Sequence, residues 1–570
     1  MISPSSLVEA MARRMFDMLA RTFPVACASD EFPFFPQWRR TEPQWSTWDC
    51  FSPETVADVV RQLSAWEDEL GRLDAPELEL AVRIDIALLR KLAHTLREQL
   101  AEVRTWEVQP TFYLTLAGIG LAEAIASADP AAGHERARGL PAFLEQSGRN
   151  LNRVPVLFRD IGLEMVADTR NYLLSLVKTL PELPTAITAL DRFGEALRKV
   201  DTRRDFRLPR ELLARVLRAH INCGLDVPEI NETLDREIEE MLSVLSREAG
   251  NLSSDTVKRS PPSWSAMLKS IPIPAVGKDG LLGLYRDEIN KLTEHCLAQG
   301  LVSPGLVAAC PVRVTPMPSF LAAIRTGASY SMPPGYLPAG GTFYIVNTHM
   351  PSTKAQAGYL RQYRMTCAHE TYPGHHLLDA SRWGLARPLR RAVEQPIFYE
   401  GWACFAEEVL RQTGYFHAPG DRLLLAWRRL LHAVRCQVDI GLQTGKMTVP
   451  AAVGYLAEAG LSTERAVSLA RKYPLNPGYQ LCYTLGLRRF LDLLARYGHD
   501  NLPDFVWAVL NQGEINFTDL EKVLRENRQL TGHHNSGKGD NFGAILGLSF
   551  GMEPGESGGL GLPAYYPENR

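Results

Sequence analysis

The chain has 570 residues, of which 45% are hydrophobic and 22% are charged. This composition is typical of a folded globular protein with a large buried core. The 62 basic and 65 acidic residues leave a formal net charge of -3, which argues against a nucleic acid or an anionic membrane as a partner.

The N-terminal segment is predicted to be an amphipathic helix rather than a targeting signal. Apolar residues recur at helical spacing through SLVEAMARRMFDMLARTF, where Asp17 and Arg21 interrupt what would be the apolar region of a signal peptide. No run has the length of a transmembrane helix, so we expect no membrane partner. The nine cysteines show no framework spacing, and we therefore expect reduced thiols and a cytoplasmic protein.

Most of the chain is predicted to be helical, and the fold class to be mainly α. Residues 53–104 and 187–250 place aliphatic side chains at three- and four-residue spacing, and helical patterns resume from about Lys354 to about Arg528. Proline and glycine at 259–277 indicate a joint. We predict an N-terminal helical region (1–258), a metal-site catalytic region (259–530) that forms one compact unit with it, and a Gly-rich C-terminal tail (531–570).

A small β element is predicted near residues 311–350. Gly340 and Gly341 precede a β-branched and aromatic run, Thr342 to Thr348, that favours a strand. Such a strand either binds an extended peptide by edge addition, through residues such as Tyr344 and Asn347, or packs on the helices as a small hairpin.

The segment that carries most chemical information is CAHETYPGHH, residues 367–376. In an unbroken helix, His375 lies about 120° from the face of His369, and His376 lies about 10 Å further along the axis. Proline and glycine at 373–374 predict a break that can bring His375 back beside His369. We therefore predict His369 and His375 as metal ligands, His376 as a neighbour of the ligands, and Glu370 as a general base beside the metal.

A third ligand is expected in FYEGWACFAE, residues 398–407, where Glu400 precedes the small Gly401. Glu407, two turns later, either orients a ligand histidine or is a solvated charge on the helix face. Two histidines and one carboxylate with an open position for water fit Zn²⁺. The same set also binds Fe²⁺ in non-haem oxygenases, so iron stays open.

At these residues the chain resembles the bacterial family known as domain of unknown function 885, a distant relative of the glutamate-ligand (gluzincin-like) zinc metallopeptidases. The family pattern HExxPGHH matches residues 369–376, and EGWAxYxE matches residues 400–407 with Phe405 in place of tyrosine. The resemblance implies a large helical metallopeptidase-like fold with a metal cleft between helices. It also supports Glu400 as the third ligand.

Two further segments resemble the family and also depart from it. Pro477-Gly478, Tyr483 and Gly486 match PGxxxxYxxG, but Tyr479 stands where glutamine is usual. Arg435, Asp439 and Gly441 match a second segment, in which Gln443 stands where a histidine is expected. The resemblance therefore does not carry the role of that histidine over to Gln443.

The predicted function is metal-dependent hydrolysis of a peptide or of a small molecule with an amide bond. Glu370 would take the proton of the attacking water, and Tyr483 would stabilise the oxyanion unless it is a core tyrosine. Arg435 or Arg364 would hold a substrate carboxylate, which favours a carboxypeptidase-like enzyme. The long helices leave a homodimer open.

Two other functions remain open. A non-haem iron oxygenase or oxidase would use the same ligands without needing Glu370 as a base. A pseudoenzyme would keep the fold to bind a small molecule; the departures at Gln443 and Tyr479 favour this alternative, and the intact histidines and glutamates argue against it.

Overall fold

The structure is a computed structural model that describes residues 3–252, 263–277, 279–318, 327–332, 340–346, 353–498 and 501–531. Residues 1–528 form one compact unit. Most of the predicted tail, from residue 532 onward, lies outside the described residues. Part of the predicted joint at 259–277 lies outside them as well.

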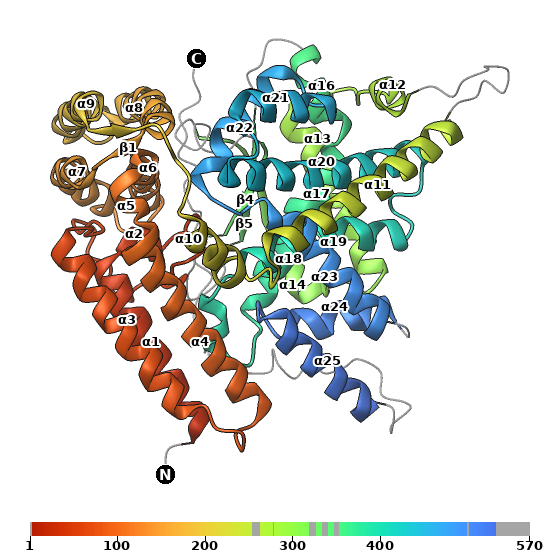
Figure 1. Ribbon diagram of the computed structural model, residues 1–570, viewed down its shortest axis with the longest axis horizontal. Helices are drawn as coiled ribbons and strands as arrows, with labels where there is room; N and C mark the ends of the chain where they lie inside the picture. Colours follow the sequence, from red (N-terminus) through yellow and green to blue (C-terminus); the bar gives the residue numbers. More distant parts are fainter. Residues whose placement is uncertain are drawn as a thin grey trace, which may run out of the picture. The chain divides into compact units, whose positions relative to one another are not determined.

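The fold is mainly helical, as predicted (Figure 1). Serine and proline begin several of the helices: the Ser3 hydroxyl accepts a hydrogen bond from the Ser6 amide, and Pro4 occupies the first helical position. The N-terminal part consists of α1 (Pro4–Thr22), α2 (Pro24–Cys27), α3 (Pro53–Leu73), α4 (Leu80–Glu98), α5 (Thr105–Val108), α6 (Pro110–Ile125), α7 (Ala132–Asn150), α8 (Val156–Leu176), α9 (Leu183–Lys199), α10 (Arg210–Arg215) and α11 (Val227–Leu252).

Within this part the helical periodicity of the sequence is interrupted in two places by wider, π-helical turns, η1 (Gln99–Val103) and η2 (Val216–His220). The two turns face each other, because Nε2 of Gln99 lies 3.0 Å from Nδ1 of His220. Two strands of two residues each, β1 (Val154–Pro155) and β2 (Thr202–Arg203), pair in parallel. β1 directly precedes α8 and β2 follows α9, so the pair links the start of α8 to the segment after α9.

The rest of the unit holds the candidate site. Residues from most of its helices pack in the larger hydrophobic core. The helices are α12 (Trp264–Ser270), α13 (Gly280–Ala298), α14 (Pro304–Ala309), α16 (Thr353–Arg361), α17 (Tyr363–Glu370), α18 (His375–Arg382), η3 (Pro388–Ala392), α19 (Pro396–Gln412), α20 (Pro419–Thr444), α21 (Val449–Glu458), α22 (Thr463–Lys472), η4 (Tyr473–Leu475), α23 (Leu481–Tyr497), α24 (Leu502–Leu510) and α25 (Phe517–Thr531).

The small β element is present as a three-stranded sheet of order β3-β5-β4, made of Val312–Pro316, Gly341–Ile345 and Ser329–Ser331. β5 pairs in parallel with β3 and in antiparallel with β4. Because β5 has a hydrogen-bonded neighbour on each side, it has no free edge to which a peptide could add as a further strand. Of the two roles considered for this strand, edge addition of a peptide is therefore wrong. Tyr344 pairs with Thr315 and Ser329, while Asn347 lies outside the described residues.

Helices α19 and α23 cross at unusually close range. A Cβ atom added to Gly401 would lie 2.6 Å from the Cα of Gly486, and one added to Gly486 would lie 2.3 Å from the carbonyl oxygen of Ile397. Only glycine at both positions allows this approach. The crossing brings Glu400, which precedes Gly401, next to the tyrosines at the start of α23.

All nine cysteines are free thiols. Among the described residues, no helix is both long and apolar enough to cross a membrane.

Candidate metal centre

The helix that carries His369 ends immediately after the HE pair. α17 stops at Glu370, and α18 begins at His375, so the predicted interruption at Pro373-Gly374 is confirmed. The interruption lies between the two histidines, and it allows both imidazoles to turn toward the same point.

Gly374 is required at this break by its contacts. A Cβ atom there would lie 1.9 Å from the carbonyl oxygen of His369 and 2.4 Å from that of Ala368. The indole Nε1 of Trp402 donates hydrogen bonds to the carbonyls of Pro373 and Gly374 at 3.0 and 3.2 Å. The break is therefore packed against α19, the helix that supplies Glu400.

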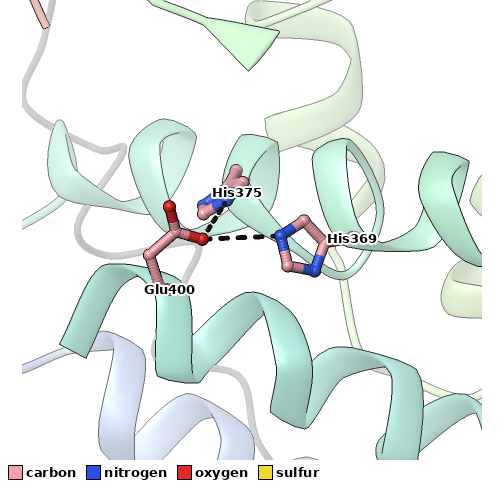
Figure 2. A group of neighbouring side chains, drawn as sticks. All are labelled: His369, His375 and Glu400. Carbon is pink, nitrogen blue, oxygen red and sulfur yellow. Dashed lines mark ion pairs between the residues drawn. The ribbon is translucent and has the colours of Figure 1, made fainter. Parts of the chain in front are cut away.

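Three buried side chains converge beside the break: His369, His375 and Glu400 (Figure 2). Oε2 of Glu400 lies 3.6 Å from Nε2 of His369 and 3.5 Å from Nε2 of His375. The two imidazole rings are perpendicular, with centroids 4.9 Å apart. One carboxylate oxygen and two imidazole nitrogens thus face a common point.

Glu407 fixes the orientation of His369. Its Oε1 accepts a hydrogen bond from Nδ1 of His369 at 3.1 Å, which leaves Nε2 directed toward Glu400. Arg428 of α20 binds the same carboxylate with both ends of its guanidinium group, Nε at 2.8 Å and Nη2 at 2.5 Å. Burial raises the pKa of Glu407, but Arg428 and His369 outweigh this effect and lower it to about 2. Glu407 is a buried anion and not a solvated charge.

The other oxygen of Glu400 is held by two tyrosines of the α23 region. The hydroxyl groups of Tyr479 and Tyr483 each donate to Oε1 at 2.8 Å. Burial raises the pKa of Glu400, but the hydrogen bonds and charges of His369 and His375 hold it well below its usual range. Tyr483, expected as an oxyanion donor, lies in the site with its hydroxyl directed at the Glu400 carboxylate.

Asp439 of α20 supports the turn that presents Tyr479. Its two carboxylate oxygens accept hydrogen bonds from the backbone amides of Gly478 and Gln480 at 3.2 and 3.1 Å. Gly478 has φ +81°, and a glycine permits this left-handed conformation without steric cost. Burial, partly offset by these two amides, raises the pKa of Asp439 to about 7.

His375 is positioned mainly by stacking. Its ring lies 4.0 Å from the ring of Tyr399, with an interplanar angle of 20°. The hydroxyl of Tyr399 donates to Oδ2 of Asp379 at 3.3 Å. Nδ1 of His375 is buried and has no hydrogen-bond partner among the described residues.

His376 is fully buried and points to a different set of partners. Its Nε2 donates to the carbonyl of Cys310 at 2.9 Å, and its Nδ1 accepts from the hydroxyl of Tyr330 in β4 at 2.8 Å. Burial lowers the pKa of His376 to about 4, so the ring is neutral. His376 fastens α18 to the small sheet and makes no hydrogen bond to the three converging residues.

A cavity of about 560 Å³ opens onto the three converging residues. Glu370, the last residue of α17, is half-buried in its wall, and Arg435 of α20 lines the same cavity. Arg364, the other arginine considered for a substrate carboxylate, is instead paired with Glu288 and Asp421. Tyr344 is not among the residues that line the cavity.

The roles of several residues of the site carry no recognisable signal in the sequence. Arg428 follows Glu407 by 21 residues on α20, a helix whose pattern indicates only amphipathicity, and Asp439 of the same helix was marked by the family resemblance but without its role at the Gly478 turn. Tyr399 directly precedes Glu400 in the FYEGWA segment, but its stacking on His375 was not predicted.

The arrangement fits a small divalent cation. When two donor atoms each bind a tetrahedral zinc ion at about 2.1 Å, the donors lie roughly 3.4 Å from each other. Oε2 of Glu400 lies at nearly this distance from Nε2 of His375 (3.5 Å) and from Nε2 of His369 (3.6 Å). Oε2 of Glu400 is buried and has no hydrogen-bond partner among the described residues. A cation between this oxygen and the two imidazole nitrogens would satisfy it.

A family model described as "Bacterial protein of unknown function (DUF885)" matches residues 41–524. The chain belongs to this family. No curated protein matches it.

In this DUF885 member, Phe405 is buried in the aromatic cluster with Trp402 and Phe490. Gln443 is buried, and neither amide atom has a hydrogen-bond partner among the described residues.

Two solved structures are similar along nearly the whole chain. One is described as "a putative lipoprotein of unknown function from Shewanella oneidensis"; it is 17% identical, with 92% of this chain and 100% of that chain covered and a TM-score of 0.72. The other is "the putative lipoprotein from Colwellia psychrerythraea", at 16% identity, 93% and 100% coverage and a TM-score of 0.77. At these identities the likeness shows a shared fold.

Proposed function

We propose that this DUF885 protein is a metal-dependent hydrolase, with zinc as its metal, that cleaves a peptide or peptide-like amide bond. The observation that carries the proposal is the convergence of His369, His375 and Glu400 at the wall of a cavity that Glu370 also lines. These are the ligand set and the adjacent base of the glutamate-ligand zinc metallopeptidases that the sequence resembles.

The roles of the protein groups follow from their positions. A bound Zn²⁺ supplies Lewis acidity and lowers the pKa of a water molecule towards about 7. Glu370 accepts a proton from the attacking water and returns it to the leaving amine. Glu407 holds His369 in the tautomer with Nε2 free, and Tyr479 and Tyr483 hold Glu400 in place.

The cavity supports a small substrate. Its volume of about 560 Å³ is in the range of sites for small molecules or short peptides, and aromatic residues such as Phe32 and Phe112 line part of it. The nine free cysteines fit a reducing compartment such as the cytoplasm.

The test combines metal analysis with one variant. Purified full-length protein is analysed for zinc and iron, and wild type and Glu370→Gln are assayed on a library of short peptides. We expect one zinc per chain in both proteins and a loss of hydrolysis of about 10²-fold or more in the variant. Glu408→Gln, at a neighbouring carboxylate bound to Arg411, is the matched control and should keep full activity.

Three outcomes would contradict the proposal. Purification with iron would favour the oxygenase or oxidase that uses the same ligands. Protein without any metal, or hydrolysis that survives in Glu370→Gln, would exclude the mechanism given above.

A further inference from the structure

Two half-buried arginines of the cavity, Arg435 and Arg465, differ from other arginines near the site. Arg364, Arg382 and Arg428 each form an ion pair with at least one carboxylate. Arg435 and Arg465 also line the cavity, but neither lies within 4.0 Å of a carboxylate in the part of the chain that the structure describes. Neither guanidinium group therefore has a direct ion-pair partner among the described residues.

Arg435 is held by neutral groups. Its Nε and Nη2 both donate to the amide oxygen of Gln480, at 3.0 and 2.6 Å. Its guanidinium lies 4.5 Å from the centroid of the Tyr483 ring. Since the hydroxyl of Tyr483 binds Glu400 at 2.8 Å, Arg435 lies one aromatic ring away from the candidate metal ligand.

Arg465 lies on α22, and its guanidinium stacks over Tyr359 at 4.7 Å from the ring centroid. Its Nε is buried and has no hydrogen-bond partner among the described residues. Burial lowers the pKa of Arg465, and the like charge of Arg435 lowers it further. Two like charges that line one cavity are stabilised by an anion bound between them.

We propose that Arg435 and Arg465 form a subsite for the free C-terminal carboxylate of a short peptide. Guanidinium groups bind carboxylates with two parallel hydrogen bonds, and a carboxylate fits better here than a neutral amide would. The proximity of Arg435 to Glu400 places the bound carboxylate near the bond to be cleaved. This inference rests on the proposed hydrolase and makes it a carboxypeptidase.

The subsite is tested by binding rather than by turnover. Glu370→Gln full-length protein, reconstituted with zinc, is titrated calorimetrically with N-acetyl dipeptides that differ in the C-terminal residue, each as a free acid and as the matching C-terminal amide. We expect at least one free acid to bind about tenfold or more tightly than its amide, as the loss of a charge-assisted contact predicts.

Variants then test whether Arg435 and Arg465 produce the preference for the free acid. Adding Arg465→Gln should remove most of the preference for the acid, whereas Arg471→Gln, on the same helix but paired at the surface with Glu164, should leave it intact. Arg435→Lys keeps the charge but loses the two-pronged geometry, and it should weaken acid binding while circular dichroism and zinc content stay unchanged.

The outcomes separate this inference from the proposed function. Equal binding of acids and amides, or no binding of any acid at millimolar concentration, would overturn the carboxylate subsite. If wild type then still hydrolyses peptides, the hydrolase proposal stands alone. Preferential acid binding that depends on Arg465, in a protein without hydrolytic activity, would instead support the subsite and contradict the hydrolase.

Discussion

Glu407 accepts a hydrogen bond from Nδ1 of His369 at 3.1 Å, and both of its oxygens are bound by Arg428. The three residues come from α19, α17 and α20, so the contact links three helices at one buried carboxylate. Because the carboxylate fixes both the tautomer and the direction of the imidazole, in the proposed zinc site it acts on metal binding without touching the metal.

We expect Glu407→Gln to lower zinc affinity by about 10- to 100-fold, as is usual when the partner of a ligand histidine is lost. The variant also leaves the buried Arg428 without its counter-ion, so the metal-free protein should melt at a lower temperature. Zinc affinity is measured by competition with a chelator. Glu408→Gln serves as control, and an equal loss of affinity in both variants would refute the orienting role.

Gly374→Ala should disrupt the site through the backbone. The new Cβ would meet the carbonyl oxygens of His369 and Ala368 at 1.9 and 2.4 Å, so the break between α17 and α18 must shift. We expect a loss of about 3 kcal/mol in unfolding free energy and a loss of zinc binding, measured by urea denaturation and metal analysis.

Gly454→Ala in α21 is the control for this substitution, because nothing lies within 4 Å of its added Cβ. It should leave zinc binding unchanged and stability the same or slightly higher, since alanine favours a helix more than glycine does. A Gly374→Ala protein that binds zinc as wild type does would show that the break tolerates a side chain.

Tyr479→Phe and Tyr483→Phe distinguish two roles for Tyr483. If both hydroxyls only hold Glu400, the two variants should lose zinc affinity to a similar, modest degree, because each removes one of two equal hydrogen bonds. If Tyr483 also stabilises an oxyanion, only Tyr483→Phe should lose a further factor of about 10² in kcat. The measurement is kcat at saturating zinc on any peptide that the wild type cleaves.

Asp439→Asn should change how stability depends on pH. The pKa of Asp439 is raised to about 7 in the folded protein, so the folded state binds one proton more than the unfolded state between about pH 4 and pH 7. The stabilisation that this extra proton gives the folded state is fully present below about pH 4, falls as the pH rises toward the folded-state pKa, and is lost above it. Wild type should therefore lose stability relative to Asp439→Asn as the pH rises from about 4 to about 7, and the difference should stay constant at higher pH.

The expected loss is on the order of 1 kcal/mol for each unit by which the pKa is raised. It is measured by urea denaturation of both proteins at several pH values. Asp58→Asn, at an exposed position of α3 beside Arg61, is the control, and its unfolding free energy should change with pH in the same way as that of wild type. If the difference in unfolding free energy between wild type and Asp439→Asn is the same at every pH from 4 to 7, the folded-state pKa of Asp439 is not raised.

The sequence alone was sufficient to find the converging residues, since they are close in the chain and their spacing has a physical meaning. The distances between His369, Pro373-Gly374 and His375 require a helix break, and the break is present. The mainly α fold was also predictable, because most helices keep regular apolar periodicity.

What could not be predicted depends on contacts between distant segments. The position of Arg428 on Glu407, or of Asp439 on the Gly478 turn, depends on how α20 packs, and helical periodicity does not determine the partner helix. A strand was predicted at 342–348 and is present at Gly341–Ile345, but its neighbours were not predicted, and its pairing on both sides excludes peptide addition, one of the two roles considered for it.

The two oxygens of Glu400 face opposite sets of partners: Oε1 the tyrosines and Oε2 the histidines. A carboxylate anchored in this way offers one oxygen and is kept from rotating to offer both, so it cannot raise the coordination number of an ion by changing its own binding mode. The anchoring therefore favours an ion that is satisfied with four ligands over larger cations that gather six or more. Discrimination between metals would then depend as much on two phenol groups as on the ligands.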